Sequence, residues 1–331
     1  MKPKLLAETI RAFHHINEAL YIVGPPGIGK TEIPRQVAND MGIGFLQIHG
    51  PMKCPEDMGF PVVADDKQTV RFVVPADMPI EGNNLWPDHG ILLIDELGQA
   101  DNSMQKVYGN IIQARELHGH KLKAGWSIVS TGNRTKDRAG AVRILSHLAD
   151  RQTEVELEVS LDDWTSHALS RGVNPIVVSF IRFKPDSLHD FDPNRDQNAT
   201  GRGWFKVSKF LGNVPEHAMF EVIRGTVGEG QAAMFQSFYD MYLKLPVPET
   251  VIMQADTYPV PEETSVRFAL TGALSHRASV DNFDQIMVFA NRMPTEFSVM
   301  LVIDAVKRCP EVQRTKGFLS WAANEGARVI L

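Results

Sequence analysis

Hydrophobic residues in the first half of the chain follow two periods in turn. Short runs typical of strands occur at residues 19–23, 45–48, 91–94, 128–131 and 153–159. Apolar residues at helical spacing precede or separate these runs, at residues 5–16, 32–41, 103–113 and 139–150. Alternating strands and helices predict an α/β domain with a parallel sheet, extending over residues 1–160.

One segment interrupts this alternation. Residues 51–66 are rich in proline, glycine and acidic side chains, and residues 69–74 alternate as an exposed hairpin arm does. We therefore predict an insertion at about residues 50–75. It is a candidate for contact with a partner, and a plain surface loop is an equally good interpretation of its composition.

The second half of the chain has helical periodicity almost throughout. A polar loop at residues 187–201 divides helical patterns, which cover residues 162–170, 175–183, 204–211, 218–226, 232–245, 266–274, 280–292 and 296–309. Pro246 and Pro248 punctuate this half. We predict a helical domain at residues 161–245 and a helical C-terminal extension at residues 246–331.

The most specific chemical signal is a phosphate-binding loop of the pattern G-x-x-x-x-G-K-S/T. It consists of Gly24, Pro25, Pro26, Gly27, Ile28, Gly29, Lys30 and Thr31. The glycines let backbone N–H groups converge on a phosphate, and the following helix N-terminus adds a partial positive charge. Lys30 neutralises the β- and γ-phosphate oxygens and Thr31 ligates Mg²⁺ in this pattern. The loop predicts binding of a nucleoside triphosphate.

Two further polar groups follow predicted strands. The run at residues 91–94 leads into Asp95 and Glu96, and the run at residues 128–131 leads into Asn133. Ligands bind at the carboxyl ends of parallel strands, so these side chains belong beside the phosphate loop. We expect Asp95 to place Mg²⁺, Glu96 to activate the attacking water, and Asn133 to bind the γ-phosphate or orient that water.

The order of these motifs resembles that of an AAA+ ATPase, and specifically the MoxR-like branch. GPPGIGKT (residues 24–31) resembles Walker A, ILLIDE (91–96) Walker B, STGN (130–133) sensor 1, and HLADR (147–151) the helix end that carries the arginine finger. The resemblance implies a P-loop αβα sandwich followed by a helical lid. It also implies ATP and Mg²⁺ as cofactors, a homo-oligomeric, hexameric ring, and Arg151 reaching the γ-phosphate of a neighbouring subunit.

The sensor 2 arginine of that family has two candidates in this chain. Arg202, in the sequence Gly-Arg-Gly-Trp, keeps the arginine and tryptophan of related ATPases but lacks their proline. Arg277 resembles the version found in another branch. We favour Arg202, because its position soon after the first pair of lid helices suits a lid that folds over the nucleotide.

Composition limits the classes of function. A hydrophobic content of 43% and a charged content of 22% are ordinary for a globular protein, and the formal net charge of −6 argues against wrapping nucleic acid. Cys54 and Cys309 are far apart and form no metal or disulfide pattern. With no signal-like N-terminus and no run long enough to span a membrane, we expect a cytoplasmic protein.

These observations lead to one function and two alternatives. We expect a ring-forming, Mg²⁺-dependent ATPase that remodels, assembles or loads a protein partner, for which the family resemblance suggests a von Willebrand A-domain protein. A nucleic-acid-directed motor is less favoured, although one set of basic residues suits it: Lys121, Lys123, Arg134, Lys136, Arg138 and Arg143. The other alternative is a nucleotide-dependent binding scaffold with little turnover.

Overall fold

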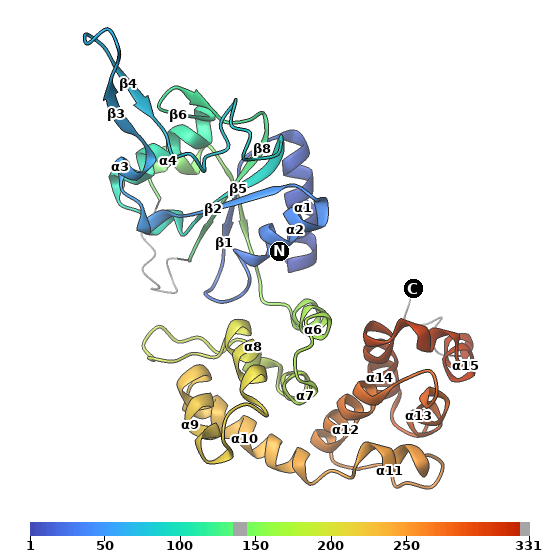
Figure 1. The fold of residues 1–331 in the computed structure, drawn as a ribbon. Helices are drawn as coiled ribbons and strands as arrows, with labels where there is room; N and C mark the ends of the chain where they lie inside the picture. The colour runs from blue at the N-terminus through green and yellow to red at the C-terminus, as the bar shows by residue number, and fades with distance from the viewer. Residues whose placement is uncertain (135–143, 325–331) are drawn as a thin grey trace. The chain divides into compact units, whose positions relative to one another are not determined.

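A computed structural model describes residues 1–134 and 144–324 of the chain (Figure 1). The chain divides into two compact units, Met1–Ser160 and Leu161–Leu331. The first unit is an α/β domain and the second is helical, so the predicted fold class is confirmed.

The first unit is built on a five-stranded sheet in the order β2-β5-β8-β1-β9. Every neighbouring pair in this sheet is parallel. The strands are β1 (Leu20–Val23), β2 (Gly44–His49), β5 (His89–Asp95), β8 (Gly125–Gly132) and β9 (Thr153–Glu156). The carboxyl ends of all five strands therefore meet at one edge of the sheet, which we call the carboxyl edge.

Helices cover both faces of this sheet. On one face, α1 (Pro3–Ile16) and α2 (Glu32–Met41) pack against side chains that include Ile91 and Leu93 of β5. On the other face, α4 (Asn102–Ala114) packs against the alternate residues of the same strand (Figure 1). Side chains of one strand alternate between faces, which explains why its apolar run is continuous.

Shorter elements complete the first unit. The insertion contains a 3-10 turn at Gly50–Met52, α3 (Pro55–Met58) and an antiparallel hairpin of β3 (Phe60–Val63) and β4 (Val70–Val73). The predicted hairpin is therefore present. The sequence did not predict a second, small hairpin, formed by β6 (Glu116–Leu117) and β7 (His120–Lys121). Of the helix expected at residues 139–150, the described part forms α5 (Ser146–Ala149), and residues 139–143 lie outside the described residues.

The second unit consists of helices around two hydrophobic cores. The first core contains Phe180, Trp204 and Phe235, and the second contains Phe283 and Phe289. The helices are α6 (Leu161–Ser170), α7 (Pro175–Phe183), α8 (Gly201–Phe210), α9 (Glu216–Val227), α10 (Glu229–Leu243), α11 (Pro248–Met253), α12 (Thr264–Arg277), α13 (Phe283–Ala290), α14 (Thr295–Arg308) and α15 (Lys316–Asn324). None of the helices in the described parts of the chain is long and apolar enough to cross a membrane.

One helix joins the two cores of the second unit. In α12, Ala269 belongs to the first core and Leu270 and Leu274 to the second. The helix is buried along much of its length because it contacts α7 on one side and α14 on the other. Two helices, α11 and α15, were not predicted. The α11 segment begins at Pro248, and a proline at the first position of a helix costs no hydrogen bond.

Candidate active site

The phosphate loop lies at the carboxyl edge, between β1 and α2. Two of its glycines have positive φ, 74° at Gly27 and 103° at Gly29, a conformation that other residues rarely adopt. Gly24 is needed for a different reason, since a Cβ there would lie 2.9 Å from the carbonyl oxygen of Leu157. The glycines predicted from the sequence thus shape the backbone of this loop.

Lys30 connects the loop to the neighbouring strand. Its side chain is buried, and Nζ donates hydrogen bonds to the carbonyl oxygens of Gly24 and Pro25 at 2.8 Å each. Nζ also donates to Oδ1 of Asn133, at 2.9 Å. Asn133 directly follows β8, the strand beside β1 in the sheet. Two residues that are far apart in the sequence therefore meet at the carboxyl edge.

Asp95 is the centre of a second group of hydrogen bonds at the same edge. It is 7% exposed, and its Oδ1 accepts from Oγ1 of Thr31 at 3.0 Å and from Oγ1 of Thr131 at 2.5 Å. Its other oxygen, Oδ2, accepts from Nε2 of Gln47 at 2.9 Å. Residues of β8, of β2 and of the start of α2 thus hold the carboxylate in place. Its position is set before any ligand binds.

Glu96 has an unusual backbone. It adopts the left-handed conformation, with φ 57° and ψ 41°, and its N–H donates to Oγ1 of Thr131 at 3.0 Å. A residue other than glycine in this conformation costs free energy, and such residues concentrate at functional sites. Thr131 therefore links Asp95 and Glu96, because its hydroxyl donates to the first and accepts from the second.

The residues of this edge fit a triphosphate with a magnesium ion. A lysine ammonium and loop N–H groups match phosphate oxygens, and a threonine hydroxyl with a carboxylate supplies the hard oxygen ligands that Mg²⁺ prefers. Among the described residues, no group of three or more histidine, cysteine, aspartate or glutamate side chains is placed to hold a metal. Few protein ligands are usual for Mg²⁺, which keeps water molecules and binds substrate phosphates.

The predicted arginines lie elsewhere. Arg151 precedes β9, and the register pairs Thr153 with Leu20, at the start of β1. The phosphate loop follows the other end of β1, so Arg151 lies at the opposite edge of the sheet, roughly 10 Å or more away from that loop. Arg202 is an exposed residue of α8, and Arg277 ends α12 and pairs with Glu249 at 3.2 Å.

The described members of the basic set, Lys121, Lys123 and Arg134, do not lie together. Lys121 and Lys123 precede β8 and Arg134 follows it, so the eight residues of that strand, roughly 25 Å in length, separate them. Lys123 pairs with Asp88 at 3.2 Å, and Arg134 pairs with Glu156 at 3.1 Å. The remaining members, Lys136, Arg138 and Arg143, lie outside the described residues.

Sequence reasoning missed three residues that contact Asp95. Gln47 and Thr131 donate hydrogen bonds to it, and Nδ1 of His49 lies 3.7 Å from its Oδ2. A signal was present, because Gln47 and Thr131 are polar residues near the carboxyl ends of otherwise apolar strands. Such positions lie beside the ligand in a parallel sheet.

Comparisons with known proteins show what the first unit is similar to. Residues 20–156 match the family described as ATPase family associated with various cellular activities (AAA). A mutant of RuvB from Thermotoga maritima is 16% identical, with a TM-score of 0.42 over 82% of this chain and 80% of that one.

NtrX of Brucella abortus in complex with ADP is also 16% identical, with a TM-score of 0.40 over 83% of this chain and 63% of the other. Both likenesses are too remote to indicate an activity. No curated protein matches the chain.

Proposed function

We propose that the AAA domain of residues 20–156 hydrolyses ATP with Mg²⁺ to give ADP and phosphate, and that rings of this chain use the reaction to remodel or load a protein partner. The family match supports an ATPase in general. The observation that carries the proposal for this chain is the meeting of Lys30 with Asn133 and of Thr31 with Asp95 at one edge of the sheet.

Each residue then has a role set by its chemistry. Lys30 and the loop N–H groups bind phosphate oxygens, and Thr31 and Asp95 hold Mg²⁺, which neutralises charge on the β- and γ-phosphates. Glu96 accepts a proton from the attacking water, and Asn133 orients that water or the γ-phosphate. In this role, Lys30 exchanges its bonds to the carbonyl oxygens of the loop for bonds to phosphate.

The position of Arg151 supports catalysis between subunits. At the opposite edge of its own sheet, it is too far from its own phosphate loop to contact a nucleotide there. It is half-buried, and no ion pair to another described residue engages it. Placed against the loop of a neighbouring subunit, its guanidinium would stabilise the charge of the transition state. We propose a ring on this basis, hexameric as the family resemblance implies, with Arg202 as the lid residue that contacts the same nucleotide.

The assignment of Glu96 is tested by Glu96→Gln, which keeps the size of the side chain and removes the base. We expect ATP to bind with unchanged affinity and phosphate release to fall by about 10²- to 10⁴-fold. Glu81→Gln, at an exposed acid of the same unit, is the matched control and should leave turnover unchanged. Normal phosphate release by Glu96→Gln would contradict the assignment.

The proposed action between subunits is tested by mixing two inactive variants. An Arg151→Ala subunit retains its own loop, and a Glu96→Gln subunit retains its arginine. If the arginine acts on the neighbour, mixed rings contain some complete sites and recover part of the activity. Sedimentation in the presence of ATP should show rings for both variants. Rings that mix but recover no activity would count against Arg151 as the finger.

The class of partner is tested with the Glu96→Gln variant, which should hold ATP-bound complexes. We expect it to retain a protein partner in the presence of ATP and to release it with ADP. Added DNA or RNA should leave the turnover of the unmodified chain unchanged. Stimulation of turnover by nucleic acid would favour a motor, and ATP-dependent assembly without phosphate release would favour a scaffold.

A further inference from the structure

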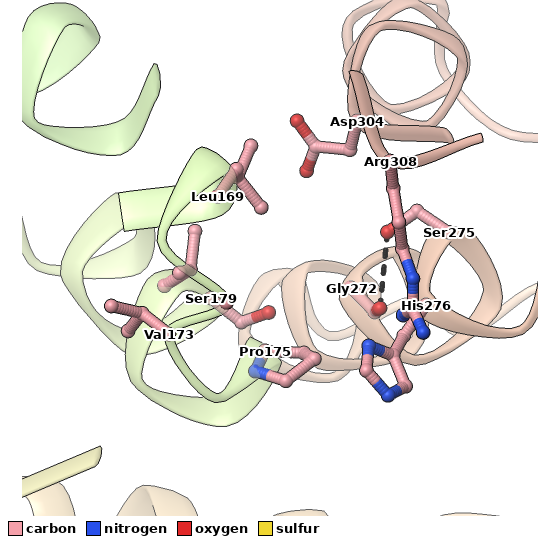
Figure 2. A pocket seen from close by; sticks show the side chains of 11 residues that line it. Leu169, Val173, Pro175, Ser179, Gly272, Ser275, His276, Asp304 and Arg308 are labelled. Carbon is pink, nitrogen blue, oxygen red and sulfur yellow. Dashed lines mark hydrogen bonds between the residues drawn. The ribbon is translucent and has the colours of Figure 1, made fainter. Parts of the chain in front are cut away.

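The second unit contains a cavity of about 160 Å³ that no part of the proposed function uses. It lies between α6 and α7 on one side and α12 and α14 on the other, and Figure 2 shows its lining side chains. Apolar groups, including Leu169, Val173 and Pro175, line the first side, and polar groups of α12 and α14 line the second. The cavity thus has one apolar wall and one polar wall.

Its volume sets the size of an occupant. An apolar cavity of about 150 Å³ holds a molecule of the size of benzene. An aromatic ring or a branched alkyl group therefore fits against Val173 and Val178, which are both buried. Concave sites with an apolar wall and a few placed polar groups are the usual form of a small-molecule site.

Ser179 provides a group that is ready to bind a ligand. The residue is 4% exposed and lines the cavity, and its hydroxyl has no hydrogen-bond partner within residues 1–134 and 144–324. Because Ser179 lines the cavity and its hydroxyl bonds to no described residue, this hydroxyl can bond to a ligand or to water in the cavity. Ser275 donates to the carbonyl oxygen of Gly272 at 3.0 Å, which leaves its hydroxyl oxygen free to accept (Figure 2).

The charges of the polar wall favour one negative charge in the ligand. Asp304 is 2% exposed and already accepts two hydrogen bonds from Arg182, so its charge is balanced. Arg308 forms no ion pair with any residue in the described ranges, and partial burial and the nearby Arg277 lower its pKa. Burial, Arg308 and Arg277 also lower the pKa of His276, so at neutral pH this side chain is a neutral hydrogen-bonding group. One guanidinium is therefore left to pair with an anion.

We propose that this cavity binds a small carboxylate carried on an apolar or aromatic body. The carboxylate pairs with Arg308, whose planar fork matches two carboxylate oxygens, and the hydroxyl of Ser179 donates to the bound ligand. A phosphate fits less well, because the residues that line the cavity offer no further cation for its second charge and Asp304 is close by. The proposal does not depend on ATP hydrolysis.

Benzoate is a suitable probe, used with the full chain and without nucleotide. Titration calorimetry should show one saturable site per chain. Benzamide has the same shape and no charge, and it should bind at least about ten-fold more weakly, because a hydrogen bond to a charged group is lost. Phenyl phosphate should also bind more weakly than benzoate. Equal affinities for benzoate and benzamide, or tighter binding of phenyl phosphate, would overturn the proposal.

Two variants locate the site. Arg308→Ala should weaken benzoate binding at least about ten-fold, and Ser179→Ala about five-fold. Arg314→Ala is the matched control, since this exposed arginine of the same unit does not line the cavity. Circular dichroism establishes that each variant is folded, and Arg308→Gln replaces Arg308→Ala if the latter unfolds. Unchanged affinity in a folded Arg308 variant, or no saturable binding to the unmodified chain, would refute the site.

Discussion

The carboxyl edge of the sheet and the cavity of the second unit satisfy their polar groups in opposite ways. At the edge, Lys30, Asn133, Thr31 and Asp95 bond to one another and to the backbone. In the cavity, the hydroxyl of Ser179 has no partner in the described ranges. The edge is therefore held in shape by its own residues, and the cavity has a polar group that only a ligand or water can satisfy.

This difference bears on how each site discriminates between ligands. A ligand at the edge must replace hydrogen bonds that already exist, so its net gain is the difference between two sets of bonds. A ligand in the cavity replaces water and breaks no hydrogen bond of the Ser179 hydroxyl to the described residues. We therefore expect substitutions at the edge to act mainly on chemistry, and substitutions around the cavity to act on stability or on binding.

The largest expected effect concerns the ion pair between Arg182 and Asp304, a residue of the polar wall of the cavity. Arg182→Ala leaves the buried carboxylate of Asp304 without its partner, and breaking a buried pair in this way costs about 3–5 kcal/mol of unfolding free energy. Urea denaturation measures the loss. Arg195→Ala removes an exposed arginine that also pairs with an aspartate, and should cost under about 1 kcal/mol. Equal losses in the two variants would show that the pair of Arg182 with Asp304 does not behave as a buried ion pair.

The next largest effect concerns the edge. Lys30→Ala should lower ATP turnover by about 10²- to 10³-fold, since one fixed charge that stabilises the transition state is lost. A steady-state phosphate-release assay measures it. Lys53→Ala, at an exposed lysine of the insertion, should have no effect. If Lys30→Ala retained full turnover, the bonds of Lys30 to Gly24, Pro25 and Asn133 would have a structural role only.

A smaller effect is expected where the edge is packed most closely. A Cβ at Gly132 would lie 2.0 Å from the hydroxyl of Tyr21, so Gly132→Ala should lower the unfolding free energy by about 1–3 kcal/mol. Tyr21→Phe removes the colliding oxygen and should restore part of the loss when combined with Gly132→Ala. Strictly additive losses would mean that the clash lies elsewhere.

The smallest effect is a pH dependence in the first unit. Asp101 caps α4, and hydrogen bonds from Ser103 and from the N–H of Met104 lower its pKa. A lowered pKa in the folded state stabilises the protein above the ordinary pKa of aspartate, and this contribution is lost as pH falls through the lowered value. The difference in melting temperature between the unmodified chain and Asp101→Ala should therefore shrink at acid pH. A constant difference would contradict this origin.

Much of the first unit was predictable because its elements have local signals. The bounds predicted for α2, residues 32–41, agree with the observed helix, since a glycine in the left-handed conformation ends it at Gly42. The alternation at residues 69–74 likewise predicted the exposed strand β4. The hairpin of β6 and β7 was missed because strands of two residues have no period to detect.

The candidate site was predictable only in part. The phosphate loop, Asp95 and Asn133 follow from motifs and from the rule that ligands lie at the carboxyl ends of parallel strands. The hydrogen bond from Gln47 to Asp95 depends on β2 lying beside β5. The order of strands in a sheet cannot be predicted from the sequence of one segment. The cavity could not be predicted from the sequence, because Ser179, Gly272 and Arg308 come together only when α7, α12 and α14 pack.

The insertion begins with a glycine that lies against the backbone of the proposed catalytic residues. A Cβ at Gly50 would lie 3.0 Å from the carbonyl oxygen of Asp95, and the hydroxyl of Tyr108 donates to the carbonyl oxygen of Gly50 at 3.3 Å. A side chain at residue 50 would therefore press on the peptide group between Asp95 and Glu96. The start of the insertion and the proposed catalytic base are therefore mechanically coupled through one peptide group.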